Sequence, residues 1–340
     1  MWKWRLWIFI TVNEIDGDNL EVLIKKERIK YMLKFLYLLA RPESNKIFIK
    51  LINKIIAKIA NLIMPIVYKC FNKELGIQDD NNVVVSLTSY PDRINKIWIT
   101  IESLLRQSSK PKKIILWLAE SQFPEKTKSL PKDLLKLQKR GLTIKFCEDI
   151  KSFKKFIYTA KIYNNYIIIT ADDDVIYPND WIEKLLKEHV VNPNCVCCYR
   201  AHPIRLNDNM RPKKYKDWDF TSNGVKGPSH LLIATGVGGI LYPPNFFTKE
   251  MLDINLIQKL CPLADDIWLK VMELINDYKV VKVDDRCKHW FLINSTQKKA
   301  LYKRNLYKNM NDEAINNLIE YYDIERWENW IDKGTGNLSK

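Results

Sequence analysis

The stretch YIIITADDD, residues 166–174, joins an apolar run to three consecutive carboxylates. Its isoleucines at positions 167, 168 and 169 are β-branched and apolar, which predicts a buried strand. That strand would deliver Asp172, Asp173 and Asp174 to its C-terminal end, the edge at which open α/β sheets bind ligands. Three adjacent anions repel one another unless a cation or hydrogen-bond donors compensate. The stretch therefore predicts a binding site at one edge of a sheet.

The acidic triplet has two interpretations. In an extended backbone Asp172 and Asp174 point to the same side and Asp173 to the other. Two carboxylates on one side suit a hard divalent cation that also holds phosphate oxygens. The alternative is a solvated acidic turn before a helix that starts near Asn179 or Asp180. The position directly after an isoleucine-rich strand favours the metal site.

Segments with strand and helix character alternate from residue 83 onward. Strands are predicted at 83–88, 114–118, 142–147 and around 167, and helices at 94–107, 133–139, 153–163 and 181–190. Such alternation predicts a mainly parallel sheet with helices on both faces. The second half is less regular, with strands predicted at 196–199, 239–241 and 280–283 and a helix at 265–276.

An apolar strand that ends in Asp-X-Asp resembles the nucleotide-sugar site of GT-A-fold glycosyltransferases. The wider pattern, over roughly residues 82–295, is most similar to the family-2-like enzymes that build bacterial surface polysaccharides. The resemblance implies an α/β fold with a GT-A-like, mainly parallel (mixed) sheet sandwiched by helices. It also implies that Asp172 meets the ribose or a metal-bound water, with Asp173 beside the donor. Asp174 would bind Mn²⁺ or Mg²⁺, which bridges the donor diphosphate.

The loop after the first predicted strand holds Thr88, Ser89 and Arg93. The resemblance implies that this loop contacts the base or ribose of the donor. The guanidinium of Arg93 also suits a diphosphate. The alternative is an ordinary helix N-terminus with Asp92 as its cap.

The loop after the third predicted strand begins with Asp149. By resemblance this carboxylate contacts the nucleobase. Lys154 and Lys155 follow it and would neutralise phosphate, although lysine pairs on exposed helix surfaces are common.

Two later segments are predicted on the acceptor side. In TGVGG, residues 235–239, the small residues Gly238 and Gly239 would let a sugar approach the backbone, or would form a tight turn or bulge. Asp265 and Asp266, followed by Trp268, resemble the base motif of inverting GT-A enzymes. One of these carboxylates would take the acceptor proton. The alternative for the pair is a helix N-cap.

Histidine and arginine side chains complete the candidate set. By resemblance His289, after the last predicted strand, supplies a further metal ligand, and neutral imidazole suits Mn²⁺. Arg200 and His202 follow the cysteine-rich strand, where they face the acceptor or sit beside the metal, or serve the structure alone.

Residues 1–75 form a predicted helical, basic and amphipathic region ahead of a polar linker at 76–82. Within it, residues 45–64 read as a helix with one stripe of lysine and asparagine and an apolar opposite face. This pattern is typical of an interfacial membrane anchor; an ordinary helix that covers the core is the alternative. The catalytic domain is predicted at 82–295 and a helical tail at 296–340.

The amino-acid composition limits the chemical class of the binding partner and indicates the cellular compartment. The net charge of +15 favours an anionic partner: a phosphorylated sugar donor, an anionic membrane surface or nucleic acid. Dispersed lysines without a zinc-finger, RNP-type or helix-turn-helix pattern argue against nucleic acid. Seven cysteines without zinc spacing fit a reducing cytosol. The absence of a membrane-length apolar run or a signal peptide fits a peripheral location on the inner membrane face.

These observations predict a divalent-metal-dependent glycosyltransferase. It would move a sugar from a nucleoside diphosphate sugar to a hydroxyl of a glycan or lipid-linked glycan, with inversion favoured by the acidic pair at 265–266. A retaining GT-A enzyme, a nucleotidyltransferase and a nucleic-acid-binding protein are the alternatives. The lack of a glycine-rich loop after the first strand argues against the nucleotidyltransferase and against dehydrogenase and P-loop folds.

Overall fold

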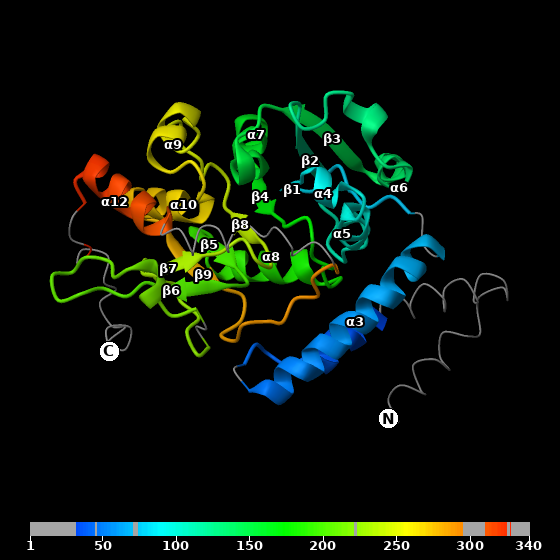
Figure 1. Cartoon of the computed structure of the whole chain (residues 1–340), viewed down its shortest axis with the longest axis horizontal. Coiled ribbons are helices and arrows are strands. Elements are labelled where there is room, and N and C mark those ends of the chain that lie inside the picture. The colour runs from blue at the N-terminus through cyan, green and yellow to red at the C-terminus, as the bar shows by residue number, and fades with distance from the viewer. Residues whose placement is uncertain are drawn as a thin grey trace.

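The computed structural model describes residues 32–44, 46–70, 74–220, 223–294, 310–324 and 327. The apolar stretch Met1–Ile10 and most of the predicted tail at 296–340 lie outside the described residues. The core is a seven-stranded sheet in the order β3-β2-β1-β4-β8-β5-β9, with helices on both sides (Figure 1). This confirms the predicted α/β fold with a mixed, mostly parallel sheet.

Four strands form the parallel half of the sheet: β1 (Val83–Thr88), β2 (Lys113–Ala119), β3 (Leu142–Cys147) and β4 (Ile167–Thr170). The chain moves outward from β1 through β2 to β3 and then returns to the other side of β1 as β4. The loops that follow β1 and β4 therefore leave the sheet in opposite directions. Ligand crevices of open α/β sheets form at such a switch point.

The other half of the sheet contains its one antiparallel element among the described strands. β8 (Ile240–Tyr242) lies between β4 and β5 (Cys195–Cys198) and runs against both, while β9 (Lys279–Lys282) is parallel to β5. Thr170, the last residue of β4, pairs with Ile240, the first residue of β8. The loop before β8 is thereby brought to the edge that carries the acidic triplet.

The two-residue period of the strands divides the core into two layers. Ile168 belongs to the layer that packs on α7 (Lys154–Tyr163) and α10 (Asp265–Ile275). Its neighbour Ile169 belongs to the layer that packs on α5 (Ile97–Leu104) and α8 (Trp181–Val191). Successive side chains of a strand point to opposite faces, so a continuous isoleucine run feeds both layers.

Several short elements had no clear sequence signal. A small antiparallel sheet joins β6 (Ala201–Pro203) to β7 (Leu232–Ala234), and α9 (Ile254–Leu260) and α12 (Met310–Tyr322) pack near α10. Strands of three residues are too short to display a period. The remaining elements are short helices of one or two turns. They are α4 (Pro91–Ile94), α6 (Lys132–Leu135) and the 3-10 helices η2 (Lys126–Ser129), η3 (Lys136–Arg140), η4 (Lys151–Phe153) and η5 (Tyr215–Asp217). The predicted boundary at 295/296 stays a prediction.

A helical layer before the sheet comprises residues 32–39 and α3 (Ile47–Cys70), which crosses the side of the molecule away from α10 and α12 (Figure 1). The helix continues past the expected end at residue 64 and contains Pro65, because Met64, Val67 and Tyr68 pack into the body. The opposite side exposes large apolar side chains, which are Ile47, Phe48, Leu51, Ile55, Ile59, Leu62 and Ile66. No helix in the described ranges is both long and apolar enough to cross a membrane.

Candidate active site

Arg93 organises two of the three aspartates at the switch point. Its Nη1 lies 2.5 Å from Oδ1 of Asp173 and 3.0 Å from Oδ2 of Asp174, and all three side chains are largely buried. The hydroxyl of Ser89 also donates to Asp173, at 2.5 Å. The loop after β1 therefore supplies the compensating charge that an acidic triplet needs.

The expected alternation of the triplet is wrong. Asp173 and Asp174 share one cation, whereas Asp172 lies on the side of Lys155, whose charge acts on it. The physical reason is that β4 ends at Thr170 and residues 173 and 174 form a turn. Strand periodicity does not continue through a turn.

Asp172 is half-buried and faces a small glycine. Its backbone N–H donates to the hydroxyl of Tyr177 at 2.8 Å. A Cβ placed on Gly236 would lie 3.4 Å from Oδ1 of Asp172 and 3.2 Å from Nζ of Lys155. Burial raises the pKa of Asp172 to about 8, and the attraction of Lys155 opposes this shift.

Lys155 connects the donor-side triplet to the acidic pair on α10. Its Nζ lies 2.8 Å from Oδ2 of Asp265, and the hydroxyl of Ser152 donates to Oδ1 of Asp265 at 2.9 Å. Burial lowers the pKa of Lys155, but Asp265, Asp172 and Asp266 outweigh burial, so the net shift is upward. Lys155 thus stays charged among three carboxylates.

Asp266 is the carboxylate suited to proton transfer. The backbone N–H of Gly236 approaches its Oδ2 at 3.4 Å. Burial, together with the neighbouring Asp265, raises the pKa of Asp266 to about 7, while Lys155 opposes the shift. The N-cap of α10 is Ala264, which makes no side-chain cap bond, so neither aspartate occupies the cap position of the alternative interpretation. A carboxylate with a pKa near 7 fits a general base.

Thr88 and Asp149 are bound into the protein. The Thr88 hydroxyl donates to the carbonyl of Trp117 at 2.8 Å. Asp149 is held by Lys154 at 2.6 Å and Lys151 at 2.8 Å. Burial raises the pKa of Asp149, but these hydrogen bonds outweigh it and the net shift is downward. Donor contacts for Thr88 and Asp149 stay predictions.

The predicted acceptor-side residues Gly238, Gly239 and Trp268 are packing residues in this structure. Both glycines have positive φ, 89° and 93°. A Cβ would lie 2.5 Å from the ring of Trp290 at Gly238 and 2.3 Å from the ring of Trp181 at Gly239. Trp268 is fully buried and its Nε1 donates to the carbonyl of Met251 at 3.1 Å. The turn interpretation therefore describes the two glycines, and Trp268 belongs to the core face of α10.

His289 is not brought together with the aspartates. It lies beside Phe291 and lines a separate cavity, and burial lowers its pKa. Within the described residues no group of three or more His, Cys, Asp or Glu side chains is arranged to hold a metal. The predicted set of Asp172, Asp174 and His289 is therefore not assembled. The charge of Asp174 nevertheless acts on Asp172, and a divalent cation held by these two carboxylates together with phosphate and water stays a prediction.

Three residues of the site escaped sequence reasoning or were left undecided by it. Tyr177 fixes the backbone of Asp172, and Gly236 is the small residue around which Lys155, Asp172 and Asp266 converge. A single tyrosine five residues after a triplet forms no recognisable pattern. In TGVGG, the sequence alone does not distinguish Gly236 from Gly238 and Gly239. The Nε of Arg200 is buried without a hydrogen-bond partner among the described residues, and the charges of Arg200 and Asp266 both act on Tyr215.

The region that holds the acidic triplet is similar to a known protein family. Residues 88–244 match the family model described as glycosyl transferase family 2. A search of curated proteins found no match to the chain. The chain is a glycosyltransferase with a GT-A-like α/β fold. The matched residues run from the last residue of β1 through β8 and include the acidic triplet.

Two solved structures are more distantly similar. One is the mannosyltransferase PcManGT from Pyrobaculum calidifontis in complex with GDP-Man and Mn²⁺, at 10% identity and a TM-score of 0.38, covering 83% of this chain and 72% of that one. The other is a CMP:2-keto-3-deoxy-manno-octonic acid synthetase complexed with CTP, at 11% identity and a TM-score of 0.35, covering 59% of this chain and 87% of that one.

Proposed function

We propose that the protein transfers a sugar from a nucleoside diphosphate sugar to a hydroxyl group of a glycan or lipid-linked glycan, with inversion at the anomeric carbon. One observation carries the proposal: Asp172, Lys155 and Asp266 converge on Gly236. A donor-side carboxylate, a cation and a carboxylate with a raised pKa thus lie around one glycine. Direct displacement needs a base on the acceptor side, and Asp266 supplies one. The bacterial surface-polysaccharide assignment stays a prediction.

The residues divide into two roles around the reacting carbon. Asp266 takes the proton of the acceptor hydroxyl as that oxygen attacks. Asp265 is held by Lys155 and Ser152, so it serves to fix Lys155 and the start of α10. Arg93 and Ser89 hold the turn that presents Asp172 and Asp174. Asp172 and Asp174 would hold Mn²⁺ or Mg²⁺ together with the diphosphate, and the metal would stabilise the charge on the leaving group.

Arg200 is assigned to the acceptor side. Burial raises the pKa of Tyr215; Asp266 adds to that shift and Arg200 opposes it, so all three groups are close enough to interact. The carbonyl of Arg200 accepts the N–H of Thr235 at 3.0 Å, which ties Arg200 to the loop that carries Gly236. A guanidinium there would bind hydroxyl or anionic groups of the acceptor.

The proposed location is the cytoplasmic face of the cell membrane, with α3 against an anionic surface. Helix 32–39 also exposes large apolar side chains, which are Phe35, Leu38 and Leu39. Lys50, Lys54 and Lys58 lie beside the exposed apolar side chains of α3. An exposed apolar stripe flanked by lysines is the pattern of an interfacial helix.

A nucleotide-binding experiment tests the enzymatic proposal. The protein is titrated calorimetrically with UDP, GDP and CMP, with and without Mn²⁺, and is then screened for hydrolysis of the corresponding nucleotide sugars. We expect one nucleotide to bind, more tightly with Mn²⁺, and its sugar conjugate to be hydrolysed slowly. Binding by none of the three nucleotides would overturn the proposal. Equal binding with and without Mn²⁺ would remove its metal component alone.

A further inference from the structure

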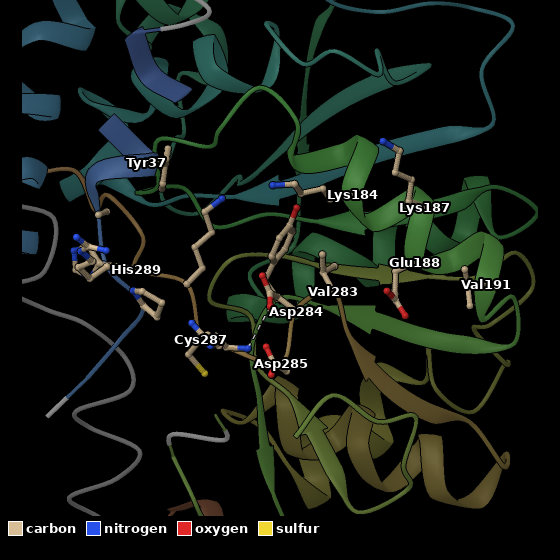
Figure 2. Close-up of a pocket in the computed structure, with 16 residues that line it drawn as sticks. Tyr37, Lys184, Lys187, Glu188, Val191, Val283, Asp284, Asp285, Cys287 and His289 are labelled. Carbon is tan, nitrogen blue, oxygen red and sulfur yellow. Dashed lines mark hydrogen bonds between the residues drawn. The ribbon is translucent and has the colours of Figure 1, made fainter. Parts of the chain in front are cut away.

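A cavity of about 770 Å³ lies apart from the candidate active site. It is bounded by helix 32–39 with the residues after it, by α8 and by the segment at 283–289 (Figure 2). None of the aspartates of the candidate active site lines it. The hydroxyl of Tyr37 in its wall donates to the carbonyl of Ile176 at 2.5 Å, so the cavity is built onto the segment that follows the acidic triplet.

Five of the residues that line this cavity are lysine or arginine, and three are acidic. Outside partners neutralise part of this charge. Lys184 pairs with Asp180 at 2.9 Å and Lys187 with Glu183 at 2.6 Å, while the acidic Glu188 pairs with Lys226 at 2.9 Å. The charges that remain are the cations Arg41, Arg286 and Lys288 and the exposed carboxylates Asp284 and Asp285.

The two arginines are held in place by their backbone only. The side chain of Asn53 hydrogen-bonds both the N–H and the carbonyl of Arg41, each at 2.9 Å. The N–H of Arg286 donates to Asp284 at 3.5 Å. Within the described part of the chain, neither guanidinium has a hydrogen bond or an ion pair. Each keeps its fork of donors for a ligand.

Lys288 is the most unusual of these cations. Its Nζ lies 4.6 Å from the ring centroid of Tyr37, 5.5 Å from that of Trp290 and 6.0 Å from that of Tyr199. No carboxylate among the described residues pairs with it. Burial and the nearby charge of Lys184 lower the pKa of Lys288 to about 8, and the charges of Asp180 and Asp284 oppose the shift. The three rings offer the ammonium a cation–π environment. A desolvated ammonium without a counter-ion gains from an anion that enters the cavity.

We propose that this cavity binds a phosphate group through Arg41, Arg286 and Lys288. Two guanidinium forks and one ammonium match the oxygens of a single phosphate. The carboxylates of Asp284 and Asp285 leave a net charge of only +1 among these five residues, which disfavours a long polyanion. The phosphate would be carried by a membrane lipid or by a small molecule. The exposed Phe35 and Leu38, on the same helix as Tyr37, are the feature that suits a lipid.

The test measures phosphate binding to the full-length protein in two arms. One arm is calorimetry with glycerol 1-phosphate, and the other is co-sedimentation with vesicles of phosphatidylglycerol against phosphatidylcholine. The variants are Arg286→Gln, at an exposed position that leaves folding intact, and Lys288→Met, which keeps a long chain under the rings. Lys136→Gln, on an exposed side chain of η3, is the control with the same charge change.

We expect both variants to lose at least tenfold in affinity in one arm, while Lys136→Gln binds as the wild type does. Loss in the vesicle arm identifies a lipid head group, and loss in the calorimetric arm a small phosphorylated molecule. Nucleotide titration of the same variants should be unchanged, which separates this site from the proposed active site. If both variants bind glycerol 1-phosphate and anionic vesicles like the wild type, the cavity is not a phosphate site.

Discussion

The ammonium of Lys155 lies 2.8 Å from the carboxylate of Asp265, which links α7 to the first turn of α10. Asp265 is followed directly by the proposed base, and the charge of Lys155 also acts on Asp172. One buried lysine therefore balances a carboxylate that follows β4 and the carboxylates that begin α10. The same ion pair joins the helix that carries Lys155 to the helix that carries the proposed base.

Breaking this pair should destabilise the protein. We expect Lys155→Met to lower the free energy of unfolding by about 3–5 kcal/mol, because it leaves buried carboxylates without their cation. Adding Asp265→Asn should recover part of the loss, as a double-mutant cycle in urea would measure. The control is Lys126→Gln, whose pair with Glu120 is more than half exposed and should be worth at most about 1 kcal/mol. If Lys155→Met and Lys126→Gln lowered the free energy of unfolding equally, Lys155 would have no special role.

The two aspartates of α10 should differ in turnover. We expect Asp266→Asn to reduce sugar transfer by about 10²–10⁴-fold, the usual contribution of a positioned base. Donor affinity should be nearly unchanged, because the diphosphate is held elsewhere. Asp265→Asn should cost less in turnover and more in stability, since it removes the partner of Lys155. If Asp266→Asn transfers sugar at the wild-type rate, the base lies elsewhere.

Turnover should also depend on pH in a specific direction. Burial and Asp265 raise the pKa of Asp266 from 3.8 to about 7, Lys155 and the N–H of Gly236 oppose the shift, and Glu273 adds to it. A base works only when deprotonated, so the rate should rise with pH and level off above about 7. The residual rate of Asp266→Asn should lack this rise. A wild-type profile that is flat from pH 5 to pH 8 would be inconsistent with Asp266 as the base.

Glycine substitutions should separate conformational strain from crowding. Gly239→Ala meets both problems, since its φ is 93° and a Cβ would lie 2.3 Å from Trp181. Gly224 has a φ of 85° but nothing within 4 Å of a Cβ. We expect Gly239→Ala to cost several kcal/mol and Gly224→Ala only about 1 kcal/mol. Thermal or urea unfolding of both variants checks this difference, and equal losses would mean that the Trp181 contact is not restrictive.

Most of the sheet was predictable because it depends on local pattern. Strand β3 matched its predicted bounds, and the isoleucine run of β4 supplied both core layers as continuous apolar strands do. The orientation of Asp173 was not predictable, because it depends on a turn whose partner, Arg93, lies 80 residues earlier. The sequence order of β8 and β5 also conceals that β8 inserts between β4 and β5.

The candidate site also divides into residues that local pattern could predict and residues that depend on contacts between distant segments. Residues next to strand ends, such as Ser89 and Asp172, were found because parallel strands end at one edge. His289 was predicted from its order in the chain alone, and the fold carries it to another cavity. Trp268 was predicted from its spacing after an acidic pair, yet helical periodicity turns it into the core. Contacts between distant segments therefore decide which motif residues meet.

The apolar stripe of α3 gives the last prediction. Phe48 is 69% exposed and Leu51 is 55% exposed, so replacing both with serine removes surface apolar area without opening the core. We expect the double variant to keep its unfolding midpoint and to lose at least tenfold in affinity for vesicles that contain anionic lipid. Lys50→Gln with Lys54→Gln should weaken binding by about 1 kcal/mol per lysine, and only at low salt. The control is Val190→Ser on α8, a position that is 79% exposed and lies outside the stripe. If the serine variant sediments with vesicles as the wild type does, α3 is not the membrane contact, and its exposed side chains serve another interface.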